Sequence, residues 1–183
     1  VAQSAKNVTI KGVLINFGSQ AIVEDMSEMQ HLLPPNSERL VNPEPDGKFQ
    51  ITFKVATPNY FRLGRNMLYL TPGDNLSVAI DNKNPLESVF KGKGSTANMY
   101  LRATPFPKGG SYLESGRNAK PTAKETVDFI LETARLRKKT LLQLKGVTLE
   151  FKRLETARIK ADIINSLIGG RIFAYRPKLA AEA

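Results

Sequence analysis

The residues that could do chemistry in this chain are few. Cysteine is absent from its 183 residues, and histidine occurs once, at position 31. Without a thiol the chain cannot form a disulfide, a thiolate metal site or a cysteine nucleophile. One imidazole cannot supply the ligands of the common zinc sites, and no Ser-His-Asp arrangement can be argued from it. We therefore predict no catalytic residue, no metal site and no cofactor, and a structural or surface role for His31.

Two other patterns could bind or react but have simpler explanations. Glu24, Asp25 and Glu28 cluster in an expected loop, whereas a glycosidase needs two acids that face each other across a cleft. Residues 92–96 read G-K-G-S-T, but they lack the order of a phosphate-binding loop and the spacing of a dinucleotide fold. We predict solvated loop carboxylates and a turn before a helix. A hydrolase or isomerase with a carboxylate pair remains an alternative, which a deep cleft with two nearby acids would reveal.

Basic residues form the most extensive candidate surface. The net charge is +10, of which +9 falls in residues 96–183 and only +1 in residues 1–95. Four basic residues lie close together in a predicted helix: Arg135, Arg137, Lys138 and Lys139. They could bind an anionic polymer or a membrane surface. Alternatively they form the solvated face of an amphipathic helix. Because no nucleic-acid motif accompanies the charge, nucleic acid is not an expected partner.

The elements that must position these residues change character halfway along the chain. In the first half, apolar residues alternate with polar ones at 49–55, after the turn dipeptide Asp46-Gly47, which predicts a hairpin between strands at 37–41 and 49–55. Gly12 blurs the alternation of the first strand and suggests a bulge or a strand covered on both sides. Other strands are expected at 8–15, 21–24, 60–63, 68–70, 76–80 and 88–91, with a type II turn at Pro72-Gly73.

The second half favours helices. A short helix is expected at 96–103, followed by an irregular connection. Thr122 to Glu125 matches a capping box, which predicts a helix that Gly146 would end. Thr148 can cap a second helix that reaches Gly169-Gly170. The expected apolar stripes are Val127, Ile130, Leu131, Ala134 and Leu141 in the first helix, and Leu154, Ala157, Ala161, Ile164 and Ile168 in the second.

These patterns together predict an α+β fold. Residues 1–95 are expected to form an antiparallel β-sandwich, because short strands separated by turns at this spacing are typical of sandwiches. Residues 96–183 are expected to form a helical segment with an antiparallel helix pair, packed on or beside the sandwich.

A series of short motifs runs through residues 8–102. They are Ile10-Lys11-Gly12, Asp46-Gly47-Lys48-Phe49, Pro58-Asn59-Tyr60-Phe61, Tyr69-Leu70-Thr71-Pro72-Gly73-Asp74, Phe90-Lys91-Gly92-Lys93-Gly94-Ser95 and Asn98-Met99-Tyr100-Leu101. In order and spacing they resemble the N-terminal domain that precedes the thioredoxin module in envelope thiol-disulfide oxidoreductases of the TlpA/ResA-like type. No single motif is specific, and the resemblance rests on the set.

The resemblance implies a β-sandwich followed by helices, located in the periplasm or cell envelope, with tethering as a lipoprotein through a signal lost from this chain. The implied partner is a downstream thioredoxin-like domain, or an envelope protein or peptide. Because the chain ends before any Cys-x-x-Cys, no active-site residue of the family can be carried over. We therefore predict a non-catalytic accessory or interaction domain. The alternative is a module that binds anionic polymer or membrane surface through its basic helices.

Overall fold

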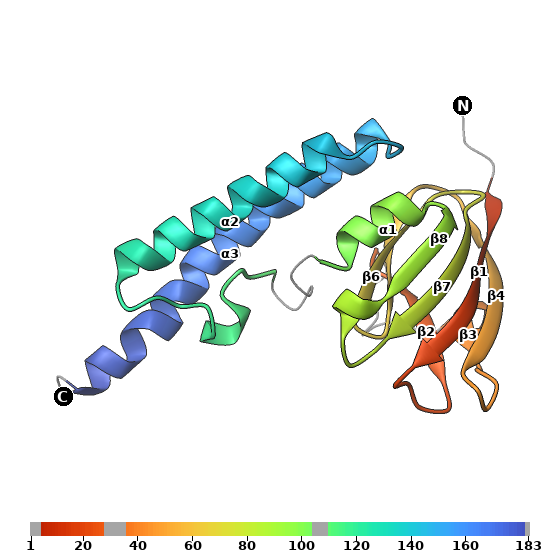
Figure 1. The fold of residues 1–183 in the computed structure, drawn as a ribbon, viewed down its shortest axis with the longest axis horizontal. Helices are drawn as coiled ribbons and strands as arrows, with labels where there is room; N and C mark the ends of the chain where they lie inside the picture. Colours follow the sequence, from red (N-terminus) through yellow and green to blue (C-terminus); the bar gives the residue numbers. More distant parts are fainter. Residues whose placement is uncertain (1–4, 28–35, 104–109, 182–183) are drawn as a thin grey trace. The chain divides into compact units, whose positions relative to one another are not determined.

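The computed structural model describes residues 5–27, 36–103 and 110–181, and it has the predicted α+β fold (Figure 1). The chain divides into two compact units, residues 1–104 and residues 105–183. The sequence had placed the division at residue 95. The short helix α1 (Ser95–Leu101) belongs to the first unit because it packs against strands β6 and β8.

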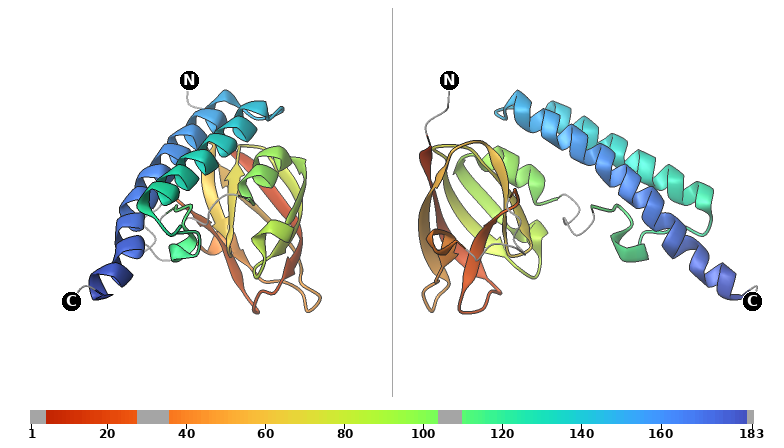
Figure 2. Two further views of the ribbon diagram at one scale, coloured as in Figure 1. Left: turned by 60° about the vertical axis from the view of Figure 1, so that its left-hand side comes forward. Right: turned by 180° about the vertical axis from the view of Figure 1, so that it is seen from behind.

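Two four-stranded sheets build the first unit (Figure 2). The strands are β1 (Lys6–Ile15), β2 (Ala21–Asp25), β3 (Leu40–Val41), β4 (Lys48–Val55), β5 (Asn59–Leu63), β6 (Asn66–Leu70), β7 (Asn75–Asp81) and β8 (Val89–Lys93). One sheet has the order β4-β1-β7-β8 and the other β3-β2-β5-β6. Alternate residues of β4 are buried, and they join apolar residues of both sheets in one core. This is the period-2 burial that the sequence predicted.

The predicted hairpin between residues 37–41 and 49–55 is wrong. A tight turn does form at Asp46-Gly47, where the Gly47 N–H donates to the Glu44 carbonyl at 2.8 Å. However, β3 pairs with β2 and β4 pairs with β1, so the chain changes sheets at this turn. An Asp-Gly turn can join the two paired strands of a hairpin or two strands of different sheets. It therefore does not identify which strands pair with each other.

Strand β1 is central in its sheet and pairs with a parallel neighbour that the sequence did not indicate. It runs antiparallel to β4 and parallel to β7, and both ladders continue without a break through Gly12. The predicted bulge is therefore absent. Gly12 has φ 150°, and a Cβ there would lie 1.8 Å from the Val78 carbonyl oxygen. Glycine is needed because β7 approaches β1 too closely for any side chain.

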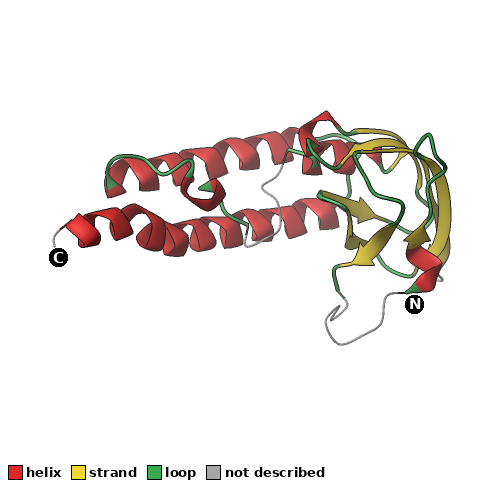
Figure 3. Cartoon of the chain, turned by 90° about the horizontal axis from the view of Figure 1, so that it is seen from below, coloured by secondary structure: helices red, strands yellow, loops and turns green. Residues whose placement is uncertain are grey.

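Two long helices, α2 (Ala123–Gln143) and α3 (Leu149–Ala181), form the predicted pair in the second unit (Figure 3). The capping box is confirmed, because the Thr122 hydroxyl accepts from the Glu125 N–H at 3.2 Å and the Glu125 carboxylate accepts from the Thr122 N–H at 3.1 Å. Thr148 caps α3 by accepting from the Phe151 N–H at 3.1 Å.

Two expectations about α3 are wrong. The helix continues past Gly169-Gly170 to Ala181, since glycine weakens a helix by only about 1 kcal/mol and does not end it without a favourable cap. The predicted apolar stripe is also on the wrong face, because Ile164 and Ile168 are 57% and 61% exposed. The face that is buried instead comprises Phe151, Glu155, Ile159, Asp162 and Ser166. Because two of these buried residues are acidic, a search for apolar residues at helical spacing did not identify this face.

On α2 the predicted stripe is correct in part. Ile130, Ala134 and Leu141 are buried, whereas Val127 and Leu131 are 37% and 48% exposed. Val127 and Leu131 each directly follow a buried residue, Thr126 and Ile130, so the buried stripe of α2 is narrower than the predicted one.

Candidate functional site

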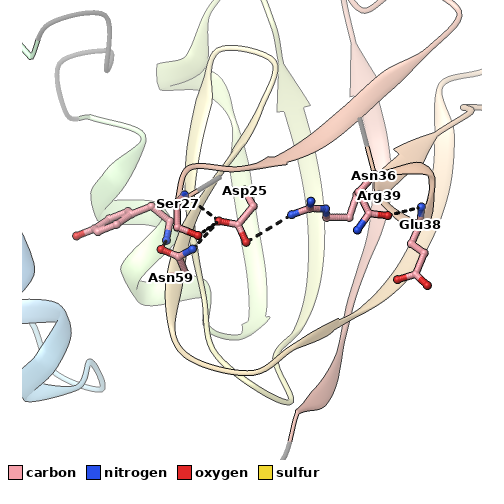
Figure 4. A network of polar contacts seen from close by, with 7 residues as sticks. Asp25, Ser27, Asn36, Glu38, Arg39 and Asn59 are labelled. Atoms are coloured by element: carbon pink, nitrogen blue, oxygen red, sulfur yellow. Dashed lines mark hydrogen bonds and ion pairs between the residues drawn. The ribbon is translucent and has the colours of Figure 1, made fainter. Parts of the chain in front are cut away.

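A polar pocket opens in the first unit where the end of β4 meets β2, β5 and the 3₁₀ helix η1 (Ser37–Arg39). Its volume is ≈ 260 Å³, which is room for a small molecule or a few side chains. Phe53, Val55 and Phe61 provide its apolar lining. Its polar lining includes Lys54 and Thr57. The other polar lining residues, whose contacts are drawn in Figure 4, are Asp25, Ser27, Asn36, Glu38, Arg39 and Asn59.

Asp25, the last residue of β2, is the centre of the polar network (Figure 4). Its Oδ1 accepts hydrogen bonds from the Ser27 N–H at 2.9 Å, the Ser27 hydroxyl at 2.7 Å and the Asn59 amide at 2.6 Å. Its Oδ2 lies 3.4 Å from Nη1 of Arg39. Three segments that are distant in sequence therefore meet at one carboxylate.

Local capping holds Arg39 in place. The Asn36 side chain accepts from the Glu38 N–H at 2.9 Å and so caps η1, the short helix that ends with Arg39. The Arg39 side chain is only 7% exposed, and a guanidinium removed from water to this extent needs a carboxylate beside it. Asp25 meets that need, which explains why this arginine can lie in the wall of the pocket.

The carboxylate at the centre of the pocket is already engaged by its own donors. The Asp25 carboxylate already accepts three hydrogen bonds and faces a cation, so it is not placed to take a proton from a substrate. Glu24 points to the other face of β2 and pairs with Arg62, so the two acids do not converge. Glu28 and His31 lie outside the described residues. Over the described ranges, no group of three or more His, Cys, Asp or Glu side chains could hold a metal ion.

Three of the four basic residues that the sequence grouped together are exposed on α2: Arg135, Lys138 and Lys139. Arg135 forms a two-point ion pair with Glu132, with both nitrogen–oxygen distances 2.7 Å. Arg137 is half-buried and lies close enough to Asp162 of α3 to influence its ionisation. Lys138 and Lys139 are exposed. Arg137 is therefore the one member of the four that is not exposed, and the spacing of the other three places them on one face of α2.

The glycine-rich segment at residues 92–96 forms the predicted turn between a strand and a helix. Gly92 and Gly94 have φ of 93° and 92°, and Gly94 packs against the Asp74 carboxyl, where a Cβ would lie 2.6 Å from Oδ2. A buried carboxylate beside the glycines would repel phosphate, which is the opposite of an anion cradle.

Three of the six motifs that carry the family resemblance, those at 69–74, 90–95 and 98–101, meet in one network. The Asn98 side chain accepts from the Tyr69 N–H at 2.8 Å and donates to the Tyr69 and Gly94 carbonyls at 3.1 and 2.9 Å. Asp74 accepts from the N–H and hydroxyl of Thr71 at 2.8 and 2.7 Å, which closes the turn that contains Pro72-Gly73. Sequence patterns assigned no role to Asn98, and its place in a short motif after a glycine turn was the only signal.

No protein-family model, curated protein or solved structure matches this chain. The resemblance therefore rests on the motif residues, and their observed roles are in stabilising the sandwich. Within the described parts of the chain, no helix is long and apolar enough to cross a bilayer.

A second polar cluster lies in the second unit, on the buried face of α3. Glu155 is fully buried and pairs with Arg158 at two points, at 2.9 and 3.1 Å. Asp162 is 4% exposed, and burial raises its pKa, an effect that Arg158 and Arg137 oppose and Glu155 reinforces. One turn further on, the Ser166 hydroxyl accepts from the Tyr112 N–H at 2.9 Å. The cluster ties the irregular segment before α2 to α3.

Replacing Asp162→Asn is expected to stabilise the protein near neutral pH by about 1 kcal/mol. A carboxyl whose pKa is raised on folding favours the folded state most below its unfolded pKa, and this contribution is lost as the pH rises through the folded pKa. The gain from Asn should therefore disappear at pH values below the ordinary aspartate pKa. Urea titrations followed by helical circular dichroism at several pH values would measure it. A variant that is less stable at pH 7 would contradict the prediction.

Proposed function

We propose that this chain is a non-catalytic accessory module of an envelope thioredoxin-like thiol-disulfide oxidoreductase, and that it holds an extended segment of a protein partner along β4. The observation that carries the proposal is that β4 is an eight-residue edge strand, paired on one side with β1, whose end reaches the polar pocket. An edge strand offers unpaired backbone groups to an extended chain, and nearby pockets accept its side chains.

The backbone of β4 is oriented for this role. The Gly47 carbonyl accepts from the Leu14 N–H of β1, whereas the next carbonyl, of Lys48, accepts from Glu44. Because backbone groups alternate in direction along an antiparallel strand, the groups of Gln50, Thr52 and Lys54 then point away from β1. An added strand would meet these groups and bring its side chains to the apolar floor of the pocket.

The absence of chemistry in the pocket fits a holding role. The carboxylate is committed to its own donors, and the family motifs stabilise the fold. The chain has no cysteine, so any thiol exchange would belong to another module. An extended linker or loop of such a module is the partner that the resemblance implies.

The test is to titrate isotope-labelled chain with the thioredoxin-like module encoded by the same reading frame. Thr52→Pro removes one outward N–H at an edge position that tolerates proline, and it should weaken binding about tenfold. Thr52→Val keeps the N–H and loses only the hydroxyl that contacts Thr9, so it should bind like the parent. Equal binding by the two variants would reject β4 as the site. A reading frame that encodes no such module would reject the proposed context.

The alternative, binding of anionic polymer or membrane through the basic helices, is favoured by exposed basic residues of the second unit, among them Lys138 and Lys139. It predicts that changing these two lysines to Gln weakens retention on an anionic resin.

A further inference from the structure

The outward face of the sheet β4-β1-β7-β8 collects lysines from three separate parts of the sequence. Side chains alternate between the core and the outside along each strand, and the observed register brings outward positions of neighbouring strands into rows. In one row, Lys11 of β1 lies between Gln50 of β4 and Ser77 of β7. Ser77 in turn pairs with Lys91 of β8. This row therefore carries two exposed cations with hydroxyl and amide groups beside them.

The neighbouring rows repeat this composition. Lys93 pairs with Asn75, and Lys54 pairs with Asn7. Thr9 and Thr52 lie in the same row as Asn75 and Lys93, and their hydroxyl oxygens form a hydrogen bond of 2.9 Å. The face as a whole, called here the lysine face, has five exposed lysines: Lys11, Lys48, Lys54, Lys91 and Lys93.

Acidic side chains are almost excluded from this face. Asp81, at the end of β7, is the one carboxylate at an outward position of these four strands, and it binds Asn16 and the N–H groups of Lys83 and Asn84. Lys48 is paired with Asp46 of the adjacent turn at 2.6 Å. Across the described residues, no carboxylate forms an ion pair with the other four lysines. Residues 1–95 have a net charge of only +1, so the summed charge does not show that lysines gather on this face and acids lie elsewhere.

We propose that the lysine face binds an acidic polysaccharide. Lysines two positions apart on a strand lie ~6.8 Å apart, and those on alternate strands lie roughly 9.6 Å apart, distances that suit charges repeated along a chain of sugars. In the rows of Lys11, Lys54 and Lys93 the uncharged side chains are hydroxyls and amides, which bond sugar hydroxyls. This site uses the outward side chains of the sheet, with two of its lysines on β4, rather than the backbone groups at the β4 edge, and it extends beyond the proposed accessory role.

The composition of the face argues against other anionic partners. No outward position of β1, β4, β7 or β8 holds an aromatic residue, and single-stranded nucleic acid is held largely by stacking on aromatic side chains. The three lysine-bearing rows from Lys54 to Lys91 contain no large apolar side chain to enter a bilayer. The remaining row, which holds Lys48, also contains Val13, Ala79 and the exposed Val89. The exposed Ile15 lies beyond it, beside Asp81.

The test compares two triple variants of the full chain that lose the same charge. One changes Lys11, Lys54 and Lys91 to Gln on the lysine face, and the other changes Lys138, Lys139 and Lys145 to Gln in the helical unit. Binding of fluorescent heparin oligosaccharide and of polygalacturonate is measured by anisotropy over a range of salt. The first variant should bind about tenfold more weakly, with a salt slope shallower by about one per lysine removed. The second should bind like the parent.

Several outcomes would overturn the proposal. These are no binding at about 50 mM salt, equal loss in the two triple variants, and binding to oligo-dT or phosphatidylglycerol vesicles as tight as to the polysaccharides. Thermal melting of each variant shows whether it remains folded. If the first variant unfolds, the single change Lys11→Gln replaces it, with an expected loss of about twofold to threefold.

Discussion

Replacing Gly12→Ala is expected to destabilise the protein by about 4 kcal/mol, the largest effect predicted for a single substitution. The new Cβ would lie 1.8 Å from the Val78 carbonyl oxygen and 2.9 Å from the Val78 nitrogen, and both are backbone atoms that cannot move aside. The φ of 150° adds strain because alanine rarely adopts it. Urea denaturation of the variant, followed by circular dichroism, would measure the loss.

Gly18→Ala is the matched control for this prediction. No heavy atom lies within 4 Å of a Cβ built at Gly18, and its φ is not positive. The added methyl restricts the unfolded chain, so the control should be neutral or more stable by up to about 1 kcal/mol. If the two variants were equally stable, the close approach of β7 to β1 would not be a property of the protein.

The parallel pairing at Gly12 shows where sequence reasoning reaches its limit in this fold. Strand positions followed from alternation, because each strand has one face on the core. Pairing depends on contacts between distant segments, and turn residues such as Asp46-Gly47 report only on the local bend. An isolated glycine in a strand correctly marked an unusual position, but it indicated a close backbone approach rather than a bulge.

The prediction of helix α3 was wrong for a different reason. The starts of these helices are encoded locally, and Thr122 and Thr148 identified both of them correctly. The buried face was not recoverable, because Glu155 and Asp162 are charged and a hydrophobicity pattern assigns such residues to solvent. Only the partner Arg158, three residues after Glu155, indicates that a buried carboxylate is compensated there.

The candidate site could be predicted only in part for the same reason. Asp25 was noticed as one of a group of acids, but its partners Arg39 and Asn59 come from other elements, and the pairing of β2 with β5 brings Asn59 to it. The lysine face was hidden because its members are separated by neutral or acidic segments, and summed charge over residues 1–95 is nearly zero. The β-register, which sequence does not supply, is what reveals both features.

Removing Asn98 is expected to have the second largest effect, a loss of about 3 kcal/mol in Asn98→Ala. The side chain is fully buried and acts like a short neighbouring strand for β6, since it both accepts from and donates to the backbone of Tyr69. Alanine would leave the N–H and carbonyl of Tyr69 and the carbonyl of Gly94 buried without this partner. Each such group costs about 1 kcal/mol or more. Urea denaturation would give the difference.

Asn84→Ala is the control for Asn98, because the Asn84 side chain is exposed and makes no capping hydrogen bond. Its stability should differ from the parent by less than about 0.5 kcal/mol. Since Asn98 lies in the last of the motifs that resemble the family, a large loss at Asn98 alone would mean that this motif specifies the attachment of α1 to the sandwich. Similar stability of the two variants would remove that structural explanation and leave Asn98 open to a role in binding.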